Sequence, residues 1–127
     1  MPESLSTRVW VADTFKREAR SLRKRYRSLE FDLQPLIEQL QGGDRPGDRI
    51  PGLADYLIYK VRVKNSNLDK GKRSGYRVIY QSLNPTTVVL LFLYVKSDRD
   101  NVTVAEICTI VERFQVDLAR SEPDFTL

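Results

Sequence analysis

The segment from Thr86 to Val95 constrains the fold of this chain more than any other. It reads TTVVLLFLYV, an unbroken apolar run of β-branched and aromatic residues. A run of this kind is typical of a central strand that is buried on both faces. It is far shorter than the roughly 20 residues that a membrane-spanning helix needs, and the first residues, MPESLSTR, lack an apolar stretch after a basic start. We therefore expect a soluble, cytoplasmic protein that contains a sheet.

Two further strands are predicted just before this run. Between Leu57 and Lys64 apolar and basic residues alternate, and side chains in a strand point to opposite faces with a period of two. A polar, glycine-containing loop at 65–75 then leads into a strand from Tyr76 to Ser82. In the first of these strands, one face would hold Leu57, Tyr59, Val61 and Val63, and the other would hold Lys60, Arg62 and Lys64.

The N-terminal segment predicts a short strand followed by a basic helix. Thr7 to Ala12 alternates as a strand, and Asp13 is a favourable N-cap for a helix from Thr14 to about Arg27. Apolar residues recur along one face of this helix at helical spacing. A basic face is more often solvated than bound to nucleic acid, so both interpretations are open for this segment alone. The basic face consists of Lys16, Arg17, Arg20, Arg23, Lys24 and Arg27.

Two more helices complete the pattern. The second should begin between Ser28 and Asp32, since Pro35 deep inside a helix would remove a hydrogen bond. Thr103 and Glu106 form a T-x-x-E capping box that opens a C-terminal helix. The core face of that helix would hold Ile107, Ile110, Val111 and Phe114.

The order strand, helix, helix, three sequential strands and helix predicts an α+β fold. We expect a small, mainly antiparallel sheet with two N-terminal helices and one C-terminal helix. The helices should cover one face of the sheet, and the other face should be open and cationic. The length is right for a single domain, which we place at 7–116 between tails at 1–6 and 117–127.

Positive charge is concentrated in two segments. The chain has 127 residues and a formal net charge of +4. Residues 14–29 and 60–77 each contain seven Lys or Arg and one acid, whereas the remainder contains seven bases and fifteen acids. So many cations on adjoining strands repel one another unless an anion normally lies beside them. The distribution favours a localised anionic partner, with a phosphate backbone as the first candidate, over a merely solvated strand face.

Few residues are available for other kinds of chemistry. The chain has no histidine and a single cysteine, Cys108, within the apolar run of a predicted helix. We interpret Cys108 as a core residue, because nothing near it in the sequence would activate a thiol. Asp98 and Asp100 are conceivable magnesium ligands, but two acids before a helix usually cap or solubilise it. We expect no metal and no cofactor.

Several of these segments together resemble a known toxin family. They are the basic helical hairpin, the Lys/Arg-rich strand, the segment K-G-K-R-S-G-Y-R-V-I-Y at 70–80, the apolar strand ending L-Y-V-K-S-D, and the capped helix. Over roughly residues 7–116 the chain resembles the RelE/ParE toxin superfamily, most closely its HigB-like branch of ribosome-dependent messenger RNA endonucleases. The resemblance implies the toxin of a type II toxin-antitoxin pair. Its partners would be mRNA on the ribosome and a cognate antitoxin that inhibits it in a hetero-oligomer.

The resemblance also implies a metal-independent endoribonuclease in which the RNA 2′-hydroxyl attacks its own phosphate. Arg77 would contact the scissile phosphate from an open sheet face, so that Arg77→Ala abolishes toxicity but leaves the fold intact. A lysine among other cations would accept the proton, since histidine is absent. The catalytic candidates are Lys70, Lys72, Arg73, Arg77, Tyr94 and Lys96. The RNA-binding candidates are Lys60, Arg62, Lys64, Arg20, Arg23 and Arg27.

One departure from the family pattern keeps other functions open. Some members carry a tyrosine near the C-terminal helix that stacks on the substrate base, and residues 97–116 contain none. Tyr94, exposed at the end of its strand, would have to substitute. The alternatives are a ParE-like inhibitor that binds DNA gyrase, and a noncatalytic nucleic-acid-binding homologue of the toxins.

Overall fold

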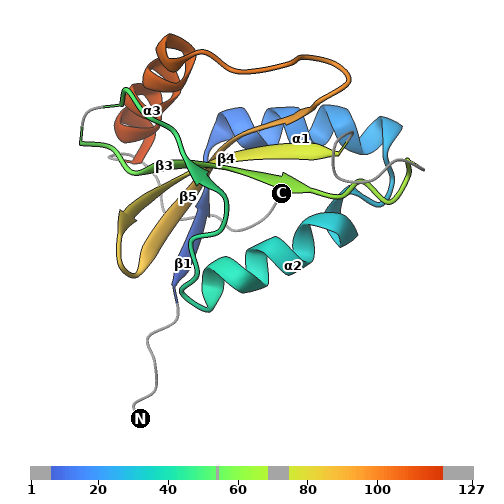
Figure 1. Ribbon diagram of the computed structural model, residues 1–127, viewed down its shortest axis with the longest axis horizontal. Coiled ribbons are helices and arrows are strands. Elements are labelled where there is room, and N and C mark those ends of the chain that lie inside the picture. The colour runs from blue at the N-terminus through green and yellow to red at the C-terminus, as the bar shows by residue number, and fades with distance from the viewer. Residues whose placement is uncertain (1–6, 54, 69–74, 119–127) are drawn as a thin grey trace.

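The computed structural model describes residues 7–53, 55–68 and 75–118, with side chains as far as Phe114 (Figure 1). Within these ranges three helices and five strands form an α+β fold, as the order of predicted elements indicated. The elements are β1 (Arg8–Val11), α1 (Asp13–Arg25), α2 (Leu29–Gln41), β2 (Asp48–Arg49), β3 (Ile58–Val63), β4 (Tyr76–Asn84), β5 (Thr87–Val95) and α3 (Val104–Leu118).

The strands form one mixed sheet in the order β1-β5-β4-β3-β2. β2, β3, β4 and β5 pair antiparallel with their neighbours, and β1 pairs parallel with β5, from Arg8 beside Thr87 to Val11 beside Leu90. The predicted central strand is confirmed, because β5 lies between β1 and β4 and is apolar on both faces. β4 is also central, so its backbone is paired on both edges.

α1 and α2 cover one face of the sheet. The apolar face predicted for the first helix is confirmed, since Phe15, Ala19 and Leu22 are buried there. Burying a large apolar side chain contributes roughly 1.5–3 kcal/mol, so this layer supplies a major part of the core. The other residues of this core layer include Leu29, Leu33, Leu36 and Leu40 of α2, Tyr76, Val78 and Tyr80 of β4, and Val88, Leu90, Leu93 and Val95 of β5.

α3 packs on the opposite face, which corrects the expectation that all the helices cover one face. Its residues Ile107, Val111 and Phe114 join Val89 and Leu91 of β5 in a second core cluster. The physical reason lies in the strand itself. A strand that is apolar on both faces requires a covering layer on each side, and the apolar stripe of α3 provides the second. The open cationic part is therefore restricted to the region that α3 leaves uncovered.

Two predicted positions in the N-terminal helices are wrong. Asp13 is the first residue of α1 rather than its N-cap; Ala12 is the N-cap and makes no side-chain capping bond. Arg27 lies in the turn between α1 and α2 instead of on the helix. The predicted start of the second helix is confirmed at Leu29, and α2 continues through Pro35.

The segment between α2 and β3 also differs from expectation. It contains the short edge strand β2, which pairs Asp48 with Lys60 and was hidden by the surrounding Gly and Pro residues. Ile58 is fully buried, whereas Leu57, predicted on the core face, is 39% exposed and precedes β3.

The C-terminal helix extends to Leu118, so the predicted tail begins later than 117. Across the described ranges, no helix combines the length and apolar character needed to cross a bilayer.

Candidate nucleic-acid interface

A row of polar side chains crosses three neighbouring strands on the face that carries α3. Arg62 of β3 is the register partner of Arg77 of β4, and Arg77 is the partner of Tyr94 of β5. Directly paired residues project on the same face with Cβ atoms about 4.5–5.5 Å apart. Lys60 lies two residues before Arg62 on the same face, and Lys96 immediately follows β5. We call Lys60, Arg62, Arg77, Tyr94 and Lys96 the sheet-face site.

Arg77 is the most buried cation of the sheet-face site. It is 5% exposed, which corrects the expectation of an open position, and its cross-strand partners Arg62 and Tyr94 flank it on the same sheet face. Its Nη1 donates to the carbonyl oxygens of Gly75 and Tyr76, both at 3.3 Å. Desolvation lowers the pKa of Arg77, and the positive charge of Arg62 lowers it further. An anion bound beside the two guanidinium groups would relieve this repulsion.

Tyr94 is buried beside Arg77 instead of exposed at the end of its strand. It is 4% exposed, and its hydroxyl has no hydrogen-bond partner among the described residues. Burial raises the pKa of Tyr94, although Arg77 and Arg99 act in the opposite direction. The phenol is therefore protonated at neutral pH, and it can donate a hydrogen bond or a proton to a ligand.

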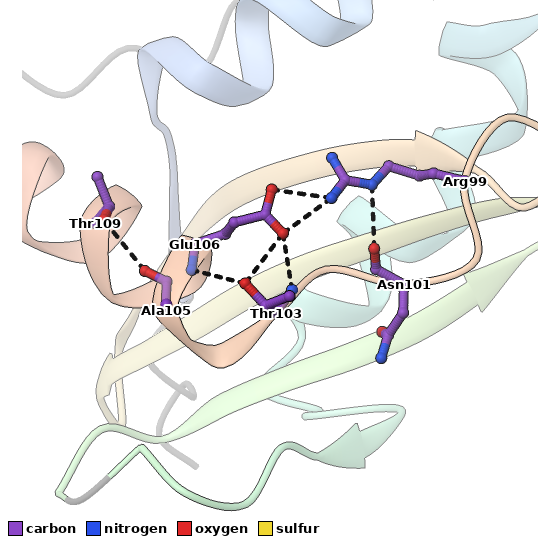
Figure 2. A network of polar contacts seen from close by, with 6 residues as sticks. All are labelled: Arg99, Asn101, Thr103, Ala105, Glu106 and Thr109. Atoms are coloured by element: carbon purple, nitrogen blue, oxygen red, sulfur yellow. Dashed lines mark hydrogen bonds and ion pairs between the residues drawn. The ribbon is translucent and has the colours of Figure 1, made fainter.

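The segment from Lys96 to Thr103 folds back over this part of the sheet and is fixed by a polar network (Figure 2). The Arg99 guanidinium donates from Nη2 to both carboxylate oxygens of Glu106 at 2.9 Å, and from Nε to the Asn101 carbonyl at 3.1 Å. The same guanidinium lies 5.6 Å from the Phe92 ring and 6.0 Å from the Tyr94 ring, within the range of cation–π attraction. Sequence reasoning missed Arg99, whose contacts with β5 depend on this fold-back.

The predicted capping box is confirmed and belongs to the same network. Thr103 N–H donates to Glu106 Oε1 at 2.9 Å, and Glu106 N–H donates to Thr103 Oγ1 at 3.1 Å (Figure 2). The bond from Thr103, followed by those from Arg99, lowers the pKa of Glu106 to about 2. Glu106 is therefore ionised near neutral pH, and it links the start of α3 to the segment that covers Tyr94.

Asp98 and Asp100 each pair with a cation. Arg25 at the end of α1 donates from Nη1 to Asp98 Oδ2 at 2.6 Å, and Lys96 Nζ lies 3.4 Å from Asp100 Oδ1. Arg25, which sequence reasoning left out of the basic face, thereby ties α1 to the segment after β5. The part of the chain that the structure describes contains no group of three or more His, Cys, Asp or Glu able to hold a metal ion. These contacts favour a structural role for both carboxylates over a metal site.

The predicted site residues are only partly brought together. Lys60, Arg62 and Lys96 join Arg77 and Tyr94, with Lys60 Nζ 3.4 Å from Asn101 Oδ1, and Lys64 is exposed just beyond β3. Arg20 and Arg23 belong to α1, which packs on the opposite sheet face, and Arg23 is paired with Glu30 at 3.1 Å. Arg27 lies in the turn after α1. The predicted basic-loop residues, Lys70, Lys72 and Arg73, lie outside the described residues.

Gly75 explains how β4 begins so close to β3. A Cβ atom added there would lie 2.2 Å from the carbonyl oxygen of Val63, so any other residue would collide with the β3 backbone. Glycine at this position thus permits the close approach of the two strands. The Lys96 N–H donates to the Gly75 carbonyl at 3.2 Å, which fixes the same point from the β5 side.

Comparison with known proteins does not assign a family to this chain. No protein-family model matches it, and no curated protein matches its sequence.

Proposed function

We propose that this protein is a ribosome-dependent messenger RNA endoribonuclease that acts as the toxin of a type II toxin-antitoxin pair. The observation that carries the proposal is the cross-strand row Arg62, Arg77 and Tyr94. It combines two guanidinium groups, which suit a phosphate, with a protonated phenol. Neighbouring groups with shifted pKa values, as at Arg77 and Tyr94, occur often at functional sites. The resemblance to the RelE/ParE superfamily supplies the substrate class.

In the proposed reaction the RNA 2′-hydroxyl attacks the adjacent phosphorus, and the bond from phosphorus to the 5′-oxygen breaks. Arg77 and Arg62 would hold the phosphate oxygens, whose negative charge grows in the transition state. Tyr94, which is protonated at neutral pH, would donate its proton to the departing 5′-oxygen. The proton of the 2′-hydroxyl has to leave to a base, and we expect a lysine to accept it because the chain has no histidine.

A second candidate function is RNA binding without cleavage. The burial of Arg77 and Tyr94 favours it, because groups that are 5% and 4% exposed need a rearrangement before they can touch a phosphate. Lys60 and Arg62 are more accessible and would still hold an RNA backbone. The two functions differ in whether the phosphodiester bond breaks.

The test is a cleavage assay with purified ribosomes, a defined mRNA and the purified protein, read by primer extension. We expect cuts in the ribosome-bound message and few in the same RNA without ribosomes. Arg62→Gln should slow cleavage about a hundredfold, the usual effect of removing one preorganised donor to a developing charge. Arg62 is exposed, so this variant should remain folded.

Arg49→Gln is the matched control. Arg49 is an exposed arginine on the neighbouring edge strand, paired with Tyr59 and hence on the other sheet face. The Arg49→Gln variant should cleave ribosome-bound message at the same rate as the parent protein. Equal losses in both variants would indicate a general charge effect and contradict a specific role for Arg62. If the parent protein binds RNA but leaves every message intact, the noncatalytic function is correct.

A further inference from the structure

β3 has an open edge beyond the end of β2. Backbone groups of successive strand residues point alternately to the two neighbouring strands. The Ile58 carbonyl accepts from Ile50 N–H at 2.8 Å on the β2 side, so the N–H and C=O of Lys60 and Arg62 point to that side too. β2 reaches Lys60 but not Arg62. Among the described residues, the backbone groups of Arg62 have no hydrogen-bond partner on this edge.

The edge continues into an apolar groove between β3 and α2. Phe31, Pro35 and Leu36 of α2 line one wall, and Val61 and Val63 of β3 line the other. The groove has a volume of about 310 Å³. Phe31 stands at its rim and is 78% exposed, the largest exposed fraction of any large apolar residue in the described ranges. An exposed aromatic beside an apolar groove is a common feature of protein interaction sites.

The charges around the groove are positive on the strand side. Arg62 and Lys64 line the groove and are exposed, and neither forms an ion pair within the described residues. The one acid in the lining, Asp32, already accepts the Ser66 N–H at 2.9 Å. A second copy of this chain would bring two such basic edges together, and a nucleic acid would gain nothing from the apolar wall. An acidic and partly apolar peptide satisfies both features.

We propose that an extended segment of a partner protein, with alternating acidic and apolar residues, adds to the edge of β3 at Arg62. Its backbone would pair with the N–H and C=O of Arg62, which have no partner on this edge among the described residues. Its apolar side chains would enter the groove beside Phe31, and its acids would meet Arg62 and Lys64. Strand addition of this kind derives affinity from the main chain and specificity from alternate side chains. The proposal does not depend on ribonuclease activity, because it concerns binding alone.

The first test uses two synthetic peptides of about six residues, a common strand length. In one, Val and Leu alternate with Glu and Asp; in the other, the same residues are grouped with the acids at one end. We expect the alternating peptide to bind at least tenfold more tightly in a fluorescence anisotropy titration. Phe31→Ala should weaken its binding about tenfold, which is typical of an aromatic anchor. Leu57→Ala, at an exposed apolar residue outside the groove, is the matched control and should bind like the parent protein.

Hydrogen exchange distinguishes a strand from other docked structures. The Arg62 amide should exchange rapidly in the free protein and become protected when the alternating peptide is bound. Peptide binding without that protection would mean a different mode, such as a helix in the groove, and would overturn the proposal. Equal affinity for the two peptides, no binding of either, or binding insensitive to Phe31→Ala would also overturn it. A concentration-dependent dimer that Phe31→Ala abolishes would assign the groove to a second copy of the chain instead.

Discussion

At the scale of single residues, the sheet-face site combines features that oppose stability. A guanidinium group that is 5% exposed lies beside a second guanidinium group, and the buried hydroxyl of Tyr94 has no partner among the described residues. Each of these arrangements costs free energy in a folded protein, because desolvated polar groups lose their hydrogen bonds to water. Local arrangements that disfavour stability are expected where a ligand later supplies the missing partner.

Arg77→Lys should keep the fold and the charge but lose most of the activity. A lysine ammonium cannot offer the fork of donors with which arginine holds two phosphate oxygens. We expect cleavage of ribosome-bound message to fall about a hundredfold. The thermal midpoint should fall by less than in Arg77→Ala, because lysine keeps a buried stem but loses the Nη1 bonds to the Gly75 and Tyr76 carbonyls. The simpler variant Arg77→Ala is less informative than the sequence suggested, since it removes a buried stem and should also lower the thermal midpoint.

Arg49→Lys serves as the control for the same chemical change on an exposed strand residue. It should match the parent protein in both cleavage and thermal midpoint. A fully active Arg77→Lys variant would show that position 77 needs only a positive charge. It would argue against bidentate contact with the phosphate.

At the scale of elements, the segment between β5 and α3 depends on one carboxylate. Glu106 caps α3 and forms an ion pair with Arg99 (Figure 2). The Arg99 guanidinium in turn lies against the rings of Phe92 and Tyr94. The pKa of Glu106 is lowered to about 2 from an ordinary value of 4.5, first by the backbone bond from Thr103. When folding lowers the pKa of a carboxylate, the ionised group stabilises the folded protein at any pH above the pKa that the group has in the unfolded chain. This stabilisation is lost as the pH falls to the pKa that the group has in the folded protein.

Glu106→Gln should therefore lower stability near neutral pH and make little difference in strong acid. We expect the gap in thermal midpoint between parent and variant to shrink progressively as the pH falls from about 4.5 to about 2. Glu112→Gln, at another exposed acid of α3, is the control and should show no such gap. A constant difference between parent and Glu106→Gln over the whole range would mean that Glu106 acts by packing and not by charge.

The elements that sequence could predict are those encoded by short-range pattern. The apolar run of β5, the alternation in β3 and the Thr103–Glu106 cap are all local, and each is confirmed. The sequence also placed the basic residues of 60–77 on adjoining strands, but the register that pairs Arg62 with Arg77 comes from the structure. The position of α3 could not be predicted from the sequence. The apolar stripe of a helix shows that one helix face is buried, but not which face of the sheet it packs against. Contacts such as Arg25 with Asp98 join residues 73 positions apart, and no local pattern encodes them.

At the scale of the whole molecule, the described cations of α1 and of β3 lie on opposite sides of the sheet. α1 presents Arg17, Arg20 and Lys24 outward from the face that it covers, whereas Lys60 and Arg62 project from the other. A short RNA bound at the sheet-face site therefore has the sheet between it and α1. The total charge of both segments acts on distant partners and raises association rates, but only groups that touch phosphate contribute to the salt dependence of binding.

This separation predicts how RNA binding responds to salt. For a single strand, the slope of log affinity against log salt falls by about 0.7 for each phosphate contact removed. The double variant Lys60→Gln/Arg62→Gln should therefore flatten the slope by about 1.4 for a short RNA. Arg20→Gln/Arg27→Gln removes the same charge from the α1 side, at two exposed residues, and should leave the slope unchanged. If both double variants flatten the slope equally, the RNA extends around the sheet edge to α1, and the basic helix is part of the binding surface.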